Sequence, residues 1–201
     1  MNTDFDIIQD KQRIIILGNE GTEEITRIAI HVLDAIEKPA DYIYADGRER
    51  LTDAPIVFIQ GDDKRSAKQA EAEFLQFKHH IALIHHIKDD SLPQGYDNLE
   101  DYVEQYEKVA KKTPKGGSIF YNKEDDLATV IGSQDYEDVR LTEYTSLSLE
   151  KTDEGFNLPN GVHVITSNQN FPSHAGGVKE LLFRISVQED EFFDGLRTFK
   201  D

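Results

Sequence analysis

Runs of apolar residues recur along the chain and predict buried strands. Residues 13–17, 54–60 and 80–87 are dominated by Ile, Val, Leu and Phe at consecutive positions. A strand of a parallel sheet is covered on both faces, so it shows such runs rather than an alternation of apolar and polar residues. Shorter runs predict further strands at 41–45, 118–121 and 139–144.

Between these runs, apolar residues recur every three or four positions, which is the spacing of one buried helix face. Ile25, Ile28 and Val32 show this spacing in a helix expected over 22–37, which ends before Pro39. Further helices are expected over 64–78, 98–112 and 127–131. Strands that alternate with helices indicate an α/β fold in three layers, with helices flanking a mostly parallel sheet.

The pattern changes after Thr145. Residues 146–150 and 161–166 alternate and are joined by a Gly-, Asn- and Pro-rich segment, which predicts a small antiparallel β segment near the C-terminal third. The end of the chain favours helices again, over 177–185 and 189–199.

The chain shows no internal repeat, low-complexity tract or interdomain linker. Its 201 residues are enough for one domain with its own core. We therefore expect a polar lead-in over 1–11 and a single domain over 12–201.

An excess of acidic residues narrows the classes of partner. There are 39 Asp and Glu against 22 Lys and Arg, for a formal net charge of −17. Nucleic acids and anionic membranes bind basic surfaces, so neither is expected as a partner. The chain has no cysteine, no signal-peptide pattern and no apolar run of the roughly 18 residues that span a membrane. We expect a cytoplasmic protein.

One stretch, Arg13–Glu24, joins a buried strand, a turn between Gly18 and Gly21, and the start of a helix. In this geometry backbone N–H groups and the helix N-terminus bind phosphate. A working phosphate-binding loop continues with Lys and then Ser or Thr, which bind the terminal phosphates and Mg²⁺. Here Thr22 stands at the lysine position and Glu23 at the hydroxyl position. The sequence therefore keeps the glycines that shape the loop but lacks the positive charge of the lysine.

This loop, together with segments 54–63, 79–90, 97–126 and 173–200, resembles the central ATP-binding domain of the Mur ligases. These enzymes join amino acids or peptides to UDP-muramate precursors of the bacterial wall. The resemblance covers about residues 12–200 and is strongest to the members that join muramate to a recycled peptide or to alanine. Family members also carry a UDP-sugar domain and a C-terminal ligase domain, and neither is expected in this chain.

The resemblance implies ATP and Mg²⁺ as the possible cofactors. The vestigial nucleotide site that it implies consists of Gly18, Asn19, Gly21, Thr22 and Asn122.

Other functional residues of the family are changed. The acid of the Glu-Gly-Asp-Glu motif is Gln60, the Asp-His pair reads Asp90-Ser91, and the His-Asn pair of the late helix reads His174-Ala175. The lysine that is carbamylated in several members has no secure counterpart in this sequence, and Lys68 and Lys78 are no more than candidates for it.

Glu20, Glu23 and Glu24 place negative charge where a phosphate would sit. At an effective dielectric constant near 20, one unit-charge contact at about 4 Å amounts to roughly 4 kcal/mol before screening. These carboxylates also favour the dipole at the helix N-terminus. The loop is therefore interpreted as a silenced anion site, with weak nucleotide binding as the alternative.

Asp62 and Asp90 follow the carboxyl ends of two predicted strands, where ligands bind in open α/β sheets. With Asp63, Asp89 and Glu20 they would offer oxygen ligands to Mg²⁺ or Ca²⁺. The alternative interpretation is a group of solvated loop carboxylates.

Four histidines, His79, His80, His85 and His86, suggest a zinc site. Neighbouring residues of a strand point to opposite faces, so His85 and His86 are not expected to bind one ion together. Histidines at strand edges are the favoured interpretation.

Apolar side chains gather near the C-terminus, at Phe192, Phe193, Leu196 and Phe199. In the Mur ligases the corresponding helix abuts the third domain, so the resemblance implies a surface for a homo-oligomer or a protein partner. The alternative is packing onto the chain's own sheet.

We therefore hypothesise a non-catalytic Mur-ligase-like domain that acts by binding or scaffolding in cell-wall metabolism. The alternatives are a component of an ATP-dependent carboxylate–amine ligase that works with separate chains, and a domain with a rewired metal or small-anion site.

Overall fold

A mixed, mostly parallel sheet forms the centre of the molecule in a computed structural model, which describes residues 5–65, 71–88 and 92–201. Within this described part the sheet has seven strands in the order β3-β2-β4-β1-β5-β6-β7. They are β1 (Gln12–Leu17), β2 (Asp41–Ile43), β3 (Glu49–Arg50), β4 (Ile56–Gln60), β5 (Ile81–Ile84), β6 (Ser118–Asn122) and β7 (Arg140–Tyr144). All neighbouring pairs are parallel except β2 and β3.

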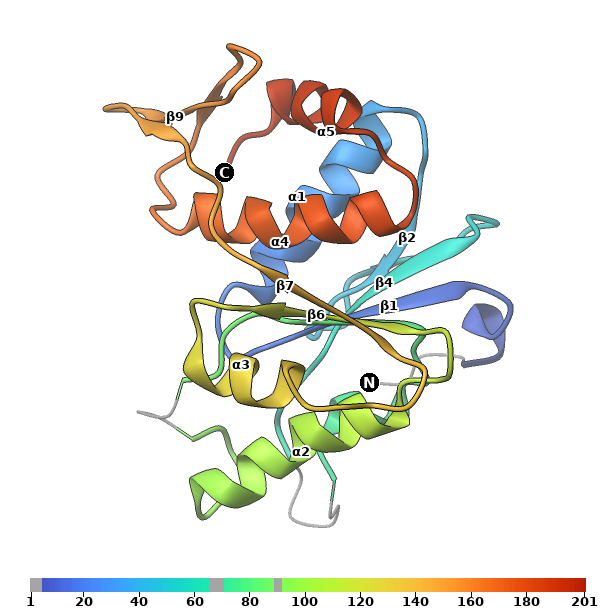
Figure 1. Cartoon of the computed structure of the whole chain (residues 1–201). Coiled ribbons are helices and arrows are strands. Elements are labelled where there is room, and N and C mark those ends of the chain that lie inside the picture. Colours follow the sequence, from blue (N-terminus) through green and yellow to red (C-terminus); the bar gives the residue numbers. More distant parts are fainter. Residues whose placement is uncertain (1–4, 66–70, 89–91) are drawn as a thin grey trace.

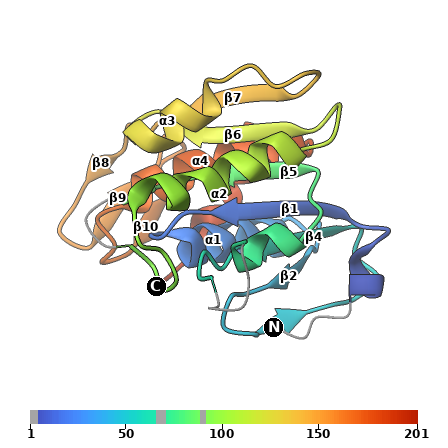
Figure 2. The ribbon, with the colours of Figure 1, turned by 90° about the horizontal axis from the view of Figure 1, so that it is seen from below.

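Helices cover both faces of this sheet and give three layers. The α-helices are α1 (Thr22–Ala35), α2 (Leu99–Lys112), α3 (Asp126–Gly132), α4 (Phe171–Arg184) and α5 (Glu189–Gly195). Helices α1, α4 and α5 lie on one side, and α2 and α3 lie on the other (Figure 1; Figure 2 shows the strand order from the side of α2). The predicted three-layer α/β fold is confirmed.

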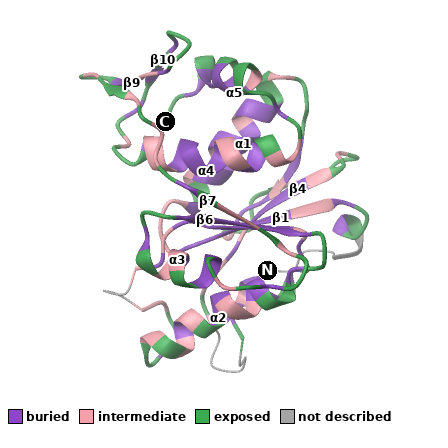
Figure 3. Cartoon of the chain, viewed as in Figure 1, coloured by how far each residue is buried: buried purple, intermediate pink, exposed green. Residues whose placement is uncertain are grey.

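The alternation of side chains along β1 explains why its sequence is apolar throughout. Ile14 and Ile16 belong to the core under α1 and α4, whereas Ile15 and Leu17 belong to the core under α2. All four side chains are fully buried. Figure 3 shows this buried centre between the helical layers.

The predicted antiparallel segment is confirmed, but its strands differ from those expected. It consists of β8 (Glu150–Lys151), β9 (Gly155–Asn157) and β10 (His163–Ile165), in the order β10-β9-β8. Strand β9 falls in the turn-rich segment that was expected to be a connection. Glycine is required at the start of this strand, because Gly155 has a φ of 154° and a Cβ atom there would overlap the carbonyl oxygen of Val164.

The helix predicted over 64–78 is wrong in the described residues. Residues 66–70, including the candidate Lys68, lie outside the described part. Beyond them the chain forms only a short 3₁₀ helix, η2 (Glu73–Gln76). Two of its backbone N–H groups donate hydrogen bonds to the segment before it. Phe74 donates to the carbonyl of Asp62 at 3.0 Å, and Glu73 donates to the carbonyl of Lys64 at 3.1 Å. These long-range bonds replace the local bonds of a helix.

Helix α4 begins at Phe171, six residues before the predicted start. Pro172 stands in its first turn, where a proline is tolerated because the N–H group has no partner within the helix. At the end of the chain, α5 gives way to the 3₁₀ helix η3 (Leu196–Thr198).

The apolar side chains near the C-terminus pack inside the domain. Phe192, Phe193, Leu196 and Phe199 are between 0% and 6% exposed and belong to the core between α1 and α4. The four side chains are thus buried within the domain, but α5 packs on helices α1 and α4, whereas the alternative weighed from the sequence was packing onto the sheet.

The chain before β1 also contacts the domain. Residues Phe5–Ile8 form the 3₁₀ helix η1, and Ile8 is 2% exposed. Lys11 reaches the buried carboxylate of Asp41 at 2.9 Å. Among the described residues, no helix is both long enough and apolar enough to cross a membrane.

Candidate functional site

The glycine loop connects β1 to α1 and is held against the end of β5. Gly18 has a φ of 143°, and a Cβ atom there would lie 2.7 Å from the carbonyl oxygen of His86. Asn19 donates its backbone N–H to that same oxygen at 3.0 Å. The Asn19 side chain accepts from the N–H of Lys88 at 2.9 Å and donates to its carbonyl at 3.2 Å. Asn19 therefore holds the loop against the segment that follows β5 in the same chain.

Gly21 ends the loop and is the N-cap of α1, with a φ of 76°. Within the described part of the chain no side chain caps this helix, and its first N–H groups have no intrahelical partner. A side chain on Gly21 would overlap Nε2 of His174 and would lie 3.0 Å from Cδ2 of His85. Glycine is required here both by its backbone conformation and by the two imidazoles that cover it.

Thr22 and Gln60 form a neutral pair beside the loop. The Gln60 amide donates to the Thr22 hydroxyl at 3.1 Å and accepts from the N–H of Ala45 at 3.2 Å. Thr22 is 6% exposed. Thr22, which stands at the lysine position of the loop, is thus hydrogen-bonded to Gln60, which stands at the position of the motif's acid.

Each glutamate of the loop region pairs with a cation from the same chain. Glu20 pairs with Lys88. Glu23 lies 2.6 Å from Nη2 of Arg48 and Glu24 lies 2.6 Å from Nη2 of Arg27. Burial raises the pKa of Glu24, and Arg27 partly offsets this. The cations beside the loop are therefore already paired with carboxylates.

Two buried histidines lie over Gly21. His85 follows β5 and His174 stands in the first turn of α4, and their ring centroids are 4.9 Å apart in an edge-on arrangement. His85 is 4% exposed and bonds through Nδ1 to the hydroxyl of Tyr144 at 2.7 Å. His174 is 3% exposed and bonds through Nδ1 to the Asn168 amide at 3.2 Å, while its Nε2 has no hydrogen-bond partner in the described residues.

Burial keeps both imidazoles neutral. It lowers the pKa of His85 to about 3, with a further contribution from the nearby His174 and His86. It lowers the pKa of His174 to about 4, against an opposing effect of Glu20. At neutral pH the pair brings no positive charge to the loop.

Asn122 lies at the end of β6, away from the glycine loop in the chain, and is 4% exposed. Its amide oxygen accepts from the N–H of Glu124 at 3.0 Å, which shapes the turn into α3. The buried Asp125 caps α3 through the N–H of Ala128 at 2.7 Å and accepts from the N–H of Ile87 at 3.2 Å. These bonds join the turn after β6 to the end of β5.

The described residues considered for metals make separate contacts within the chain. Asp62 accepts from the N–H of Lys64 at 3.0 Å, and Asp63 accepts from the hydroxyl of Tyr102 at 2.6 Å. Asp90, Asp89 and Ser91 lie outside the described residues. Within the described part of the chain, no group of three or more His, Asp or Glu side chains is placed to hold a metal ion.

The pairing of His85 with His174 was not predicted from the sequence. His85 was considered for zinc and His174 as a changed family position, and nothing in the local pattern connected them. The topology supplies the connection, because β5 lies next to β1 and α4 packs against α1.

No protein-family model matches the sequence. Solved structures match it in fold. The UDP-N-acetylmuramate:L-alanyl-gamma-D-glutamyl-meso-diaminopimelate ligase from Neisseria meningitides matches with a TM-score of 0.81 and 14% identity, over 98% of this chain and 68% of that one. The UDP-N-acetylmuramate–alanine ligase from Thermotoga maritima matches with a TM-score of 0.71 and 16% identity, over 98% of this chain and 46% of that one.

A third match is a ligase with a different name. The folylpolyglutamate synthase from Mycobacterium tuberculosis, whose structure is a complex with ADP, matches with a TM-score of 0.73 and 8% identity, over 98% of this chain and 60% of that one. This chain thus spans between about half and two thirds of the length of these enzymes. The shared feature is architecture, and the chain has a Mur ligase-like fold.

Proposed function

We propose that this chain is a Mur-ligase-like domain with a silenced nucleotide site, and that it acts in the cytoplasm by binding or scaffolding in peptidoglycan metabolism. The observation that carries the proposal is the position of the His174 imidazole against Gly21. A phosphate bound by the loop would need the space next to the N-terminus of α1. Two neutral imidazoles cover that position instead of a lysine.

The charges around the loop support the same proposal. A nucleotide with Mg²⁺ needs a cation for its phosphates and oxygen ligands for the metal. The hydroxyl of Thr22 is engaged by the neutral amide of Gln60, and Arg48 and Lys88 already bind glutamates. These residues do not fit Mg²⁺-ATP, because binding it would bring phosphates next to three carboxylates.

Thermal unfolding with and without Mg²⁺-ATP tests the proposal. A ligand that binds only the folded chain adds about 2.7 kcal/mol to stability at a hundred times its dissociation constant. We expect the midpoint of unfolding in millimolar Mg²⁺-ATP to equal the midpoint in the control, which is magnesium sulfate at the same concentration. A rise that saturates with nucleotide would overturn the proposal.

A second function rests on a different observation, namely that the N-terminus of α1 is left without a side-chain cap. The N-terminus of α1 and the backbone of Gly18 and Gly21 together keep the geometry of an anion site. This geometry favours a ligase component that works with separate chains. Incubation with Mg²⁺-ATP and a muramate acceptor distinguishes the two. Release of phosphate above that of a Gly21→Ala variant would favour the ligase component.

Binding in the absence of catalysis requires a partner, and we propose a protein partner or a second copy of the chain. The four apolar side chains near the C-terminus are buried and do not form that surface. Light scattering over a range of concentrations measures self-association directly. A mass of one chain at every concentration would leave a different protein as the proposed partner.

A further inference from the structure

A separate cavity of about 420 Å³ lies at the opposite edge of the sheet from the glycine loop. Its lining includes Gln12 at the start of β1, Ile81 at the start of β5, and the turn before β6. Because these strands are parallel, their starts share one edge and their ends share the other. The volume is in the range of small-molecule sites, which is about 300–1,000 Å³. Nothing in the proposed function uses this cavity.

Arg184, in the last turn of α4, supplies the cavity with a positive charge. Its Nε donates to the hydroxyl of Ser118 at 2.9 Å, and Ser118 is fully buried. This bond fixes the plane of the guanidinium. Within the described residues, the two terminal nitrogens of Arg184 have no carboxylate or carbonyl partner. They present the parallel N–H pairs that bind a carboxylate with two hydrogen bonds.

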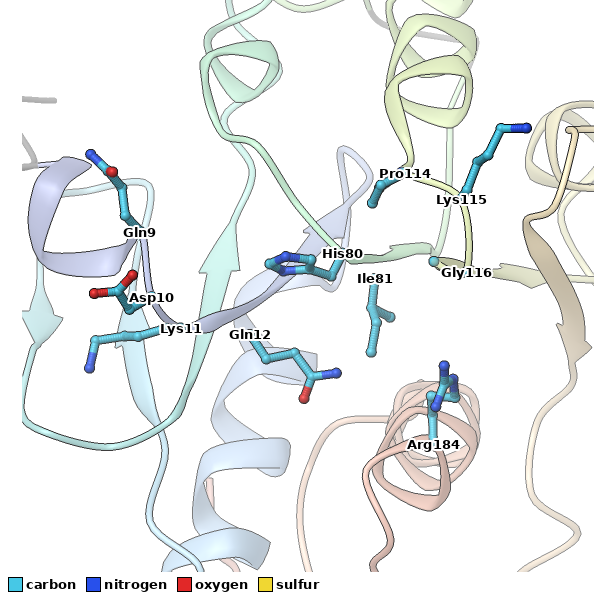
Figure 4. A pocket seen from close by; sticks show the side chains of 11 residues that line it. Gln9, Asp10, Lys11, Gln12, His80, Ile81, Pro114, Lys115, Gly116 and Arg184 are labelled. Carbon is cyan, nitrogen blue, oxygen red and sulfur yellow. The ribbon is translucent and has the colours of Figure 1, made fainter.

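The other cations that line the cavity are neutralised by the protein. Lys11 lies 2.9 Å from the carboxylate of Asp41, and Lys115 lies 2.6 Å from that of Glu137. Figure 4 shows the amino groups of both lysines turned away from Arg184. Asp10 adds one negative charge to the lining. Among the lining residues, Arg184 is therefore the cation left for a ligand. One such cation favours a ligand with a single negative charge over a ligand with two.

Gln12 completes the polar part of the cavity. Its side chain extends toward Arg184 and Ile81 in Figure 4, and its amide forms no hydrogen bond within the described residues. The amide N–H can donate to the same anion as the guanidinium. Ile81 and Pro114 provide apolar walls beside these donors.

We propose that this cavity binds a small monocarboxylate, with the carboxylate on the terminal nitrogens of Arg184 and the amide of Gln12, and a short apolar body against Ile81 and Pro114. A phosphate dianion suits the cavity less well, because it carries two charges and would lie near Asp10. The site is independent of the glycine loop and of any nucleotide.

Chemical-shift titration of the isotope-labelled full chain tests the proposal with butyrate, its neutral analogue butyramide, and inorganic phosphate. Butyrate is expected to shift the amide signals of Gln12, Gly116 and Gly117 and to saturate in the millimolar range. Butyramide and phosphate are expected to bind at least about tenfold more weakly. The absence of saturable shifts with butyrate would overturn the proposal, and so would equal binding of butyramide or tighter binding of phosphate.

Variants assign the donors. Arg184→Met is expected to weaken butyrate binding at least about tenfold, since it removes a charged hydrogen-bond donor. The matched control is Arg197→Met, because Arg197 is exposed and pairs with Asp194 at 3.0 Å away from the cavity. Gln12→Leu keeps the bond between Arg184 and Ser118 and is expected to weaken binding a few-fold. Unchanged affinity in both Arg184→Met and Gln12→Leu would contradict the assignment even if one variant folds poorly.

Discussion

The imidazole of His85 meets that of His174 edge-on over Gly21, with 4.9 Å between the ring centroids. The two residues come from the end of β5 and the start of α4, so the contact joins the sheet to the helical layer beside the loop. Both rings are buried and neutral at neutral pH. The proposed silencing of the glycine loop rests on this pair of histidines and on the carboxylates around the loop.

The first prediction concerns pH. The pKa of His174 is about 4 in the folded chain and 6.5 without perturbation, so the unfolded chain takes up the proton first as pH falls. The free energy of unfolding should therefore fall between pH about 6.5 and about 4, by up to about 1.4 kcal/mol per pH unit for each such histidine. Urea unfolding across this range measures the slope.

His174→Gln should make that slope shallower, because the variant has no group to protonate at this position. The matched control is His163→Gln on β10, where the side chain is exposed and the slope should stay as in the parent chain. An identical slope in His174→Gln and the parent would show that His174 is not held neutral by burial.

The second prediction compares two glycines with nearly the same φ. Gly21 has a φ of 76° and Gly161 a φ of 78°, but apart from the residues next to it in sequence, no described residue has an atom within 4 Å of a Cβ built on Gly161. Gly161→Ala should cost about 1–2 kcal/mol for the left-handed conformation alone. Gly21→Ala should cost about 1–3 kcal/mol more, because the methyl group overlaps His174. Denaturant unfolding gives both values.

A double variant separates the two causes. Gly21→Ala with His174→Ala should recover the part of the loss that comes from overlap and keep the part that comes from φ. Equal losses for Gly21→Ala and Gly161→Ala would mean that the imidazole does not press on the loop.

The third prediction contrasts two ion pairs. Lys11 and Asp41 have side chains 9% and 0% exposed, whereas Arg48 and Asp46 are both more than half exposed. Asp41→Asn should cost about 3–5 kcal/mol, since it leaves the ammonium of Lys11 buried without a counter-charge. Asp46→Asn should change the free energy of unfolding very little, because solvent screens that pair. A small loss for Asp41→Asn would contradict the role given to Lys11 in fastening the N-terminal segment.

The sequence predicted the sheet and most helices because their patterns are local. The run at 13–17 and the spacing of Ile25, Ile28 and Val32 reflect burial that each element shows on its own. The segment 64–78 contains apolar residues at helical spacing, yet Phe74 bonds to Asp62 across a loop, which no local pattern reveals.

Only the part of the candidate site that is local in the sequence was predicted. The turn at Gly18 and Gly21 follows from strand, glycine and helix in immediate succession. The histidines over it come from segments far apart in the chain, so their contact depends on strand order and on the packing of α4 against α1. Asn19 was predicted to belong to a nucleotide site, and the structure shows it bonded to Lys88.

Calorimetric titration of the purified chain with ATP, in the presence and absence of Mg²⁺, tests the central claim most directly. A silenced site predicts no saturable heat up to millimolar nucleotide under either condition. Saturable binding in the micromolar range would contradict the account. It would mean that the backbone of Gly18 and Gly21 binds phosphate despite the histidines and carboxylates around it.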